Sequence, residues 1–100
     1  MDTLSETLHR VLTGYAGEML NGHSYLTTNA DRTVFAIIGL GYIGDQHFMD
    51  ASLVARLARN TIVIEHDVNN KPLVAALLAA GISRDHIILA YLGESTTAAA

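Results

Sequence analysis

The sequence predicts a single α+β domain, and three observations support this class. Residues 4–20 and the segment after Pro72 repeat apolar side chains at helical spacing. Residues 24–67 contain short apolar, β-branched segments separated by turn residues. The 100 residues are 50% apolar and 16% charged, which suits one core of modest size. We therefore expect residues 1–94 to form one domain and residues 95–100 to form a frayed tail.

The first helix is predicted over residues 4–20. Thr3 and Glu6 match the Thr-x-x-Glu capping box, which satisfies two backbone groups at a helix start. Gly14 and Gly17 weaken the later turns by roughly 1 kcal/mol each relative to alanine, and Asn-Gly at residues 21–22 then ends the helix. The apolar face of this helix carries Leu4, Leu8, Val11, Leu12, Tyr15 and Met19.

Two short strands follow, over residues 24–28 and 33–40, and turn residues 29–32 join them. The second helix begins after Asn-Asn-Lys-Pro at residues 69–72, which supplies a cap and a first-turn proline. Gly81 stands where a helix C-terminus favours positive φ. After a polar turn at residues 84–86, residues 86–91 form a strand buried on both faces. The stripe of the second helix consists of Leu73, Val74, Leu77 and Leu78.

Residues 45–60 have two interpretations, and they imply different functions. The run Gly39-Leu40-Gly41-Tyr42-Ile43-Gly44 has the spacing of a dinucleotide-binding turn, and Glu65 lies 21 positions after it, near the place of a ribose-binding acid. In that interpretation residues 45–60 form a helix that packs Met49, Leu53, Val54 and Leu57 on a βαβαβ sheet. Gly39, Gly41, Gly44 and Glu65 then form a Rossmann-type cofactor site.

The competing interpretation is a hairpin of two strands, residues 51–58 and 61–67, with a turn at Arg59-Asn60. Residues 51, 53, 55 and 57 then share one face, and 62, 64 and 66 alternate with 63, 65 and 67. The hairpin is favoured because large and polar residues, 45–48, directly follow the glycines. In addition, only Arg59 and Asn60 remain to end a long helix. We therefore expect no cofactor, and we interpret the glycines as the end of one strand and the link to the next.

Other candidate sites are weak. The five histidines (9, 23, 47, 66 and 86) lack the spacing of a metal site, and we expect no metal. Glu65 and Asp67 are expected on one strand face about 7 Å apart. That arrangement suits either paired carboxylates or a solvated face, and Asp67 with Asn69 and Asn70 also suits a helix cap. No catalytic residue is assigned.

Composition excludes several classes of protein. The net charge is −4 and the six Lys and Arg residues are scattered, so autonomous nucleic-acid binding is not expected. The sequence contains no cysteine, no signal peptide and no apolar run of membrane-spanning length, and a cytoplasmic location is therefore predicted. The apolar fraction favours contacts with another protein or with a second copy.

Two stretches resemble the XisI family, the fdxN element excision controlling factor proteins of cyanobacteria and some other bacteria. They are Asn60-Thr-Ile-Val-Ile-Glu-His-Asp67 and the segment 71–91, above all Gly-Ile-Ser-Arg-Asp-His-Ile-Ile-Leu-Ala-Tyr at residues 81–91. The resemblance extends over residues 3–94. The chain resembles a divergent member, because Ser83 replaces a proline that is usual in the family and Leu92-Gly93-Glu94 replaces a His-Pro-Pro type ending.

The resemblance implies an α+β fold with an N-terminal helix, an antiparallel meander of about four strands, a second helix and a final strand. It also implies a non-enzymatic accessory or regulatory subunit in DNA rearrangement, with a partner of the XisH type that resembles restriction-type endonucleases. Members of the family tend to form homo-oligomers, so we expect one here.

Overall fold

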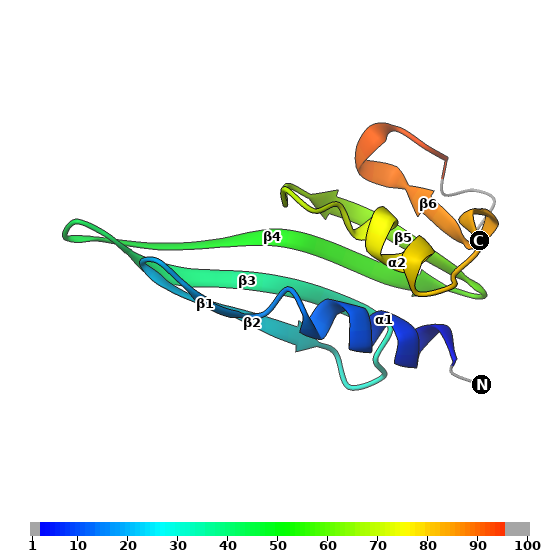
Figure 1. Cartoon of the computed structure of the whole chain (residues 1–100), viewed down its shortest axis with the longest axis horizontal. Helices are drawn as coiled ribbons and strands as arrows, with labels where there is room; N and C mark the ends of the chain where they lie inside the picture. Colours follow the sequence, from blue (N-terminus) through cyan, green and yellow to red (C-terminus); the bar gives the residue numbers. More distant parts are fainter. Residues whose placement is uncertain (1–2, 96–100) are drawn as a thin grey trace.

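The computed structural model describes residues 3–95, and it confirms the α+β class (Figure 1). Six strands form one sheet in the order β1-β2-β3-β4-β5-β6, antiparallel throughout except for the parallel pair β5–β6. The elements are α1 (Leu4–Thr13), β1 (Gly17–Met19), β2 (Gly22–Thr28), β3 (Val34–Ile43), β4 (Gln46–Ala58), β5 (Thr61–Asp67), α2 (Leu73–Ala79), η1 (Arg84–His86), β6 (Ile87–Leu89) and η2 (Ala90–Leu92).

The capping box of α1 is confirmed, but the predicted length of the helix is wrong. The Glu6 N–H donates to Thr3 Oγ1 at 3.1 Å, and the Thr3 N–H donates to Glu6 Oε1 at 3.0 Å. The helix ends at Thr13 rather than at residue 20. Gly17 has φ +142°, which a helix does not accommodate, and residues 17–19 pair with β2 as the short strand β1. Sheet hydrogen bonds therefore replace helical ones where two glycines weaken the helix.

The predicted strands at residues 24–28 and 33–40 are confirmed, and both are longer than expected. They correspond to β2 (Gly22–Thr28) and β3 (Val34–Ile43). Asn29 closes the turn between them, since its Oδ1 accepts from the N–H groups of Thr33 at 2.8 Å and Val34 at 3.0 Å. The meander of four strands, β2 to β5, is thus present, with β1 added at one edge and β6 at the other.

Residues 46–58 form a strand, so the helical interpretation of residues 45–60 is wrong. The hairpin is confirmed, with β5 at the predicted residues and β4 extended back to Gln46. The left-handed residue of its turn is Arg59, with φ +58°. With 13 residues at about 3.4 Å each, β4 spans the 45 Å length of the molecule.

Two β-bulges break the simple alternation that the sequence predicts for β4 and β5. Ile37 pairs with Leu53 and Ile38 with Ala51, so Ser52 is an extra residue in β4. Similarly, Val54 pairs with His66 and Ala55 with Ile64, so Glu65 is an extra residue in β5. Each bulge moves the residues beyond it to the opposite face. Ala51 therefore does not share a face with residues 53, 55 and 57, and His66 does not share one with residues 62 and 64.

Asp67 positions α2. Because it pairs with the buried Leu53 across the sheet, it lies on the helix-covered face, where its Oδ2 accepts from the Leu73 N–H at 2.7 Å. Pro72 is the N-cap residue rather than a first-turn residue, and it offers no side-chain acceptor. Asp67 supplies the missing acceptor from the preceding strand. Gly81 has the expected positive φ, +97°, just beyond the end of the helix.

The predicted final strand is confirmed but shorter, because β6 covers Ile87–Leu89 and residues 90–92 turn into a 3₁₀ helix. All three residues of β6 are buried, as expected for a strand covered on both faces. The polar turn at residues 84–86 is a 3₁₀ helix that begins at Ser83. Most of the tail that the sequence predicts, residues 96–100, lies outside the described residues.

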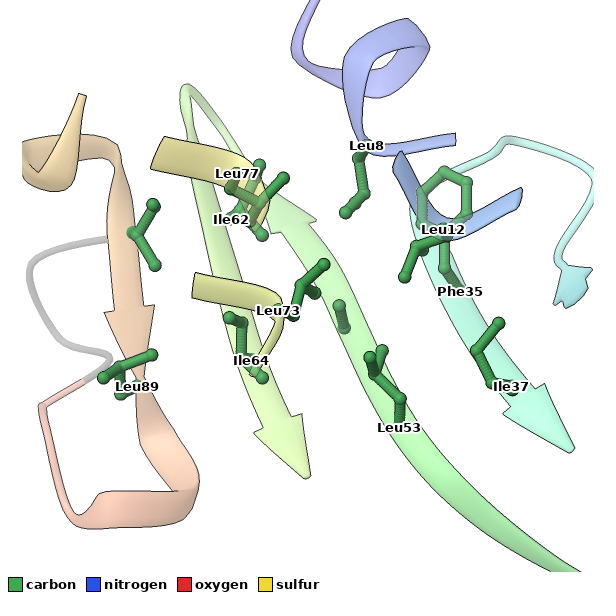
Figure 2. Close-up of a cluster of buried hydrophobic side chains, with 12 residues drawn as sticks. Leu8, Leu12, Phe35, Ile37, Leu53, Ile62, Ile64, Leu73, Leu77 and Leu89 are labelled. Carbon is green, nitrogen blue, oxygen red and sulfur yellow. The ribbon is translucent and has the colours of Figure 1, made fainter. Parts of the chain in front are cut away.

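Both helices cover one face of the sheet, and the main core lies between them and that face. Figure 2 shows side chains of α1 and α2 pointing toward those of β3, β4, β5 and β6. The helices do not cover the whole sheet, because the β3–β4 hairpin extends beyond them to one end of the molecule (Figure 1). The core residues labelled in Figure 2 are Leu8, Leu12, Phe35, Ile37, Leu53, Ile62, Ile64, Leu73, Leu77 and Leu89.

Candidate functional site

The glycine run lies within a strand and not at a nucleotide-binding turn. Gly39 and Gly41 belong to β3, where they face Asp50 and Phe48 of β4, and Gly44 occupies the turn to β4 with φ +61°. The strand that follows is antiparallel, whereas the cofactor fingerprint needs a helix after the last glycine. The dinucleotide-binding interpretation of Gly39, Gly41 and Gly44 is therefore wrong. Their interpretation as strand end and link is confirmed for Gly44, whereas Gly39 and Gly41 lie inside a strand that continues to Ile43.

A close approach of neighbouring groups explains why residue 41 is glycine. A Cβ atom at Gly41 would collide with the Asn21 carbonyl oxygen and lie 2.8 Å from Cε1 of Phe48. A Cβ atom at Gly39 would lie 3.1 Å from the terminal Cε of the Met19 side chain and 3.4 Å from Oδ1 of Asp50, which are much milder contacts. On this face of the β3–β4 hairpin, side chains from β1 and β4 thus lie over bare backbone.

The structure separates Glu65 and Asp67, which the sequence placed on one strand face. Glu65, at the bulge, forms an ion pair with Arg56 of β4, with 2.7 Å between Nε and Oε2. Asp67 lies on the helix-covered face and also accepts from the N–H and side-chain amide of Asn69, at 3.0 and 2.9 Å. The two carboxylates therefore cannot act as a pair, and the helix-cap interpretation of Asp67 is confirmed.

Two tyrosines lie near the Asp67 carboxylate. Burial raises the pKa of Tyr15, and the negative charge of Asp67 raises it further. The pKa of Tyr91 is raised by the same two causes in the same order. The Tyr15 hydroxyl donates to the Lys71 carbonyl oxygen at 2.9 Å and so ties the segment after α1 to the segment before α2. The Tyr15 hydrogen bond therefore helps to fix the start of α2.

The five histidines stand in different surroundings. His66 and His86 place a ring nitrogen 3.1 and 2.7 Å from the carbonyl oxygens of Ala51 and Asn60, respectively. The other three contact aromatic rings: His9 with Phe35, His23 with Tyr25, and His47 with Tyr42. Within residues 3–95, no three His, Cys, Asp or Glu side chains come together in the manner of a metal site.

The face of the sheet away from the helices carries an apolar and aromatic surface on the β3–β4 hairpin and its neighbour β2. Residues paired in register share a face, so the pairs Tyr25–Ile38, Ile38–Ala51 and Leu40–Met49 place these side chains together. Tyr25, Tyr42 and Met49 are 48%, 60% and 69% exposed. We call the following residues the open face: His23, Tyr25, Ile38, Leu40, Tyr42, His47, Met49 and Ala51.

A groove between α1 and α2 is a second candidate surface, with a volume of about 600 Å³. Its lining is mostly apolar and includes Val11 of α1, Ala75 and Ala79 of α2, and Lys71 from the segment before α2. Small side chains make this groove, but none of the groups that line it is a buried polar side chain without a partner. The open face is therefore the more informative surface.

Sequence reasoning missed the open face, although one signal for it was present. Ile38, Leu40 and Tyr42 alternate with Gly39, Gly41 and Ile43, so the larger side chains of this stretch gather on one side. The bulge at Ser52 was not visible in the sequence, and it decides that Ala51 joins this side.

Comparison with known proteins gives a consistent result. The model of the family described as XisI protein matches residues 1–99. Among solved structures, an XisI-like protein from Anabaena variabilis ATCC 29413 superposes with a TM-score of 0.73 at 16% identity, covering 85% of this chain and 81% of that one. The fdxN element excision controlling factor XisI from the same organism gives a TM-score of 0.66 at 22% identity, covering 87% and 88%.

No curated protein matches the chain. At these identities the two structures establish the fold, and the fold is the one described above. Neither helix within residues 3–95 combines the length and apolar character that a bilayer crossing requires.

Proposed function

The chain belongs to the XisI family, and on that premise we propose that it is a non-enzymatic accessory subunit of a DNA-rearrangement system. In this proposal it controls a process such as the excision of a DNA element through contacts with other proteins. The observation that carries the proposal is the open face, because a sheet of a two-layer domain is ordinarily covered where its side chains are apolar.

The charges of the chain support a role through protein contacts rather than through DNA. The net charge is −4, and the basic side chains of Arg56 and Arg84 are held in ion pairs with Glu65 and Glu94. Proteins that grip DNA alone gain much of their affinity from clustered cations. In the proposed system another subunit therefore makes the main contact with DNA.

The proposed partner is a protein of the XisH type, which resembles restriction-type endonucleases. The solved structure named fdxN element excision controlling factor XisI shares the fold of this chain, which supports a place in the same kind of system. In this arrangement the partner supplies the phosphodiester chemistry, and the chain controls its assembly or its position.

The test is affinity capture followed by reconstitution. The tagged chain, expressed in its host, is expected to co-purify with a nuclease-fold protein identified by mass spectrometry, and the tag alone is not. The two purified proteins are then expected to form a complex, and the nuclease activity of the complex on element-boundary DNA is expected to differ from that of the partner alone. Capture of no nuclease-fold protein, or no change in activity, would contradict the proposal.

A further inference from the structure

We propose that the open face packs against the open face of a second copy of this chain, around a two-fold axis. This inference deepens the proposed function, since it identifies one of the protein contacts on which that function depends. The occupant is a second copy because the exposed area, the lack of charge and the shape of the sheet all fit one.

The sheet lacks a second layer at the end formed by the β3–β4 hairpin. The β3–β4 hairpin extends past both helices (Figure 1). On the face that the helices cover elsewhere, Phe48 and Met19 lie over Gly41 and Gly39. On the other face nothing within residues 3–95 lies over Tyr42 or Met49, which are 60% and 69% exposed. Sheets that present apolar side chains pack against another layer, and two sheets do so about 10 Å apart.

The exposed area of the open face suits the centre of a dimer interface. Taking about 200 Å² for a fully exposed tyrosine, Tyr25 and Tyr42 alone leave about 200 Å² open to solvent. Met49 exposes about as much area as either tyrosine. Val34 lies on the same face and is 43% exposed. A stable interface buries about 800 Å² on each partner. The open face thus supplies the centre of such an interface, and neighbours such as Val34, Thr27 and Ala36 supply its rim.

The open face is uncharged. None of the eight side chains of the open face is Lys, Arg, Asp or Glu, in a chain that carries 16 such residues (16% of 100). Glu18, which pairs with His23, borders the surface. An uncharged surface rich in Tyr and Met matches the depletion of charge at interface centres, and it is complementary to another uncharged surface. The open face of a second copy is such an uncharged surface.

The geometry of the sheet edges favours face-to-face packing over extension of the sheet at β6. Glu94 Oε1 accepts from the Leu89 N–H at 2.7 Å, and Arg84 Nη1 donates to the Ile87 carbonyl oxygen at 2.6 Å. Arg84 and Glu94 also pair with each other at 2.7 Å. The outer backbone groups of β6 are therefore already bonded, and a strand from another molecule cannot pair there.

The test measures oligomeric state by sedimentation and light scattering of the full chain. The wild-type chain is expected to be dimeric at tens of micromolar. Met49→Lys and Tyr42→Lys are each expected to weaken the dimer at least tenfold, because each would bury an unpaired charge. Leu92→Lys is the matched control, since Leu92 is 67% exposed and lies in η2, outside the open face. Circular dichroism checks that every variant is folded.

Cross-linking provides a second measurement that does not depend on weakening the dimer. The chain has no cysteine, so Met49→Cys introduces a single thiol into the open face. A short bismaleimide is expected to link Met49→Cys chains into dimers and to leave Leu92→Cys chains monomeric.

The outcomes separate this inference from the proposed function. A wild-type chain that is monomeric at 100 µM overturns the inference, and so does a dimer that survives Met49→Lys with its affinity within threefold. The latter result would point to pairing along the uncovered edge of β2 at residues 25–28. The wild-type chain could also be a monomer that captures the nuclease-fold partner, with capture lost in Met49→Lys. In that case the open face binds the partner, and the inference fails while the proposed function stands. If the chain is a dimer that Met49→Lys weakens, but no nuclease-fold protein is captured, the proposed function fails and the inference stands.

Discussion

The helix-covered part of the sheet and the β3–β4 hairpin beyond it are built from the same strands but follow different rules. In the covered part, fully buried aliphatic residues such as Leu53 and Leu77 fill the space between the layers. In the hairpin, Gly39 and Gly41 line one face and the exposed side chains of the open face line the other. The covered part stabilises the fold, and the hairpin is available for contacts.

The two β-bulges mark the boundary between these regions. Ser52 and Glu65 are the extra residues, and the Ser52 carbonyl oxygen accepts from the Val68 N–H at 3.0 Å and from the Asn69 side chain at 3.2 Å. The first bulge brings Ala51 to the open face, and the second brings Asp67 to the helix-covered face. The bulge at Ser52 therefore extends the open face, and the bulge at Glu65 places Asp67 where it caps α2.

The largest effect is expected in the covered part. Leu53→Ala removes a fully buried side chain from the core and is expected to lower the free energy of unfolding by about 2–5 kcal/mol. Met49→Ala, in the same strand but 69% exposed, is expected to change it by less than about 0.5 kcal/mol at a concentration where the chain is monomeric. Urea denaturation measures both. Equal effects would show that the hairpin is as tightly packed as the core.

A smaller effect is expected where the hairpin itself is tightly packed. Gly41→Ala forces the new Cβ against the Asn21 carbonyl oxygen and the Phe48 ring, and it is expected to cost about 1–3 kcal/mol. Gly39→Ala is the control, since only the flexible end of Met19 must move, and its cost is expected to stay below about 1 kcal/mol. Thermal denaturation compares them. Similar costs would mean that the close approach at Gly41 is relieved without penalty.

The cap of α2 is expected to be worth about 1–2 kcal/mol. Asp67→Ala leaves the Leu73 N–H, which now donates at 2.7 Å, without its acceptor. Glu65→Ala, two residues earlier, breaks only a partly exposed ion pair with Arg56 and is expected to cost less than about 1 kcal/mol. Urea denaturation at pH 7 distinguishes the two. A larger loss in Glu65→Ala would contradict the separate roles given to these carboxylates.

The smallest effect concerns the β6 edge and depends on pH. The hydrogen bond from the Leu89 N–H, and then Arg84, hold the pKa of Glu94 below its ordinary value. A lowered pKa in the folded state means that the stabilisation is complete above the ordinary glutamate pKa and is lost as the pH falls through the lowered one. Denaturation midpoints between pH 2 and pH 7 are expected to depend less on pH in Glu94→Gln. An unchanged pH profile would remove Glu94 from this role.

Local chemistry predicted the elements that depend on neighbours in the chain. The Thr3–Glu6 capping box, the turn at Arg59-Asn60, the end of α2 before Gly81 and the limits of β5 all follow from interactions between residues close in sequence. The apolar pattern also identified most of the core, because burial in the sheet and under the helices repeats every two residues or every three to four. The family resemblance rested on two of these segments and is confirmed.

The sequence by itself therefore determined the class of the fold and the order of its main elements, α1, the strands β2 to β5, α2 and β6, and it favoured a strand over a helix after the glycine run. Only the tertiary structure decided where α1 ends, since residues 17–19 gain a strand partner in β2 that lies beyond the range of helical spacing. It also decided which face each residue of β4 and β5 occupies, because a bulge of one residue leaves the composition of a strand unchanged and reverses its alternation. The open face and the separation of Glu65 from Asp67 follow from those registers, which are set between strands and not within them.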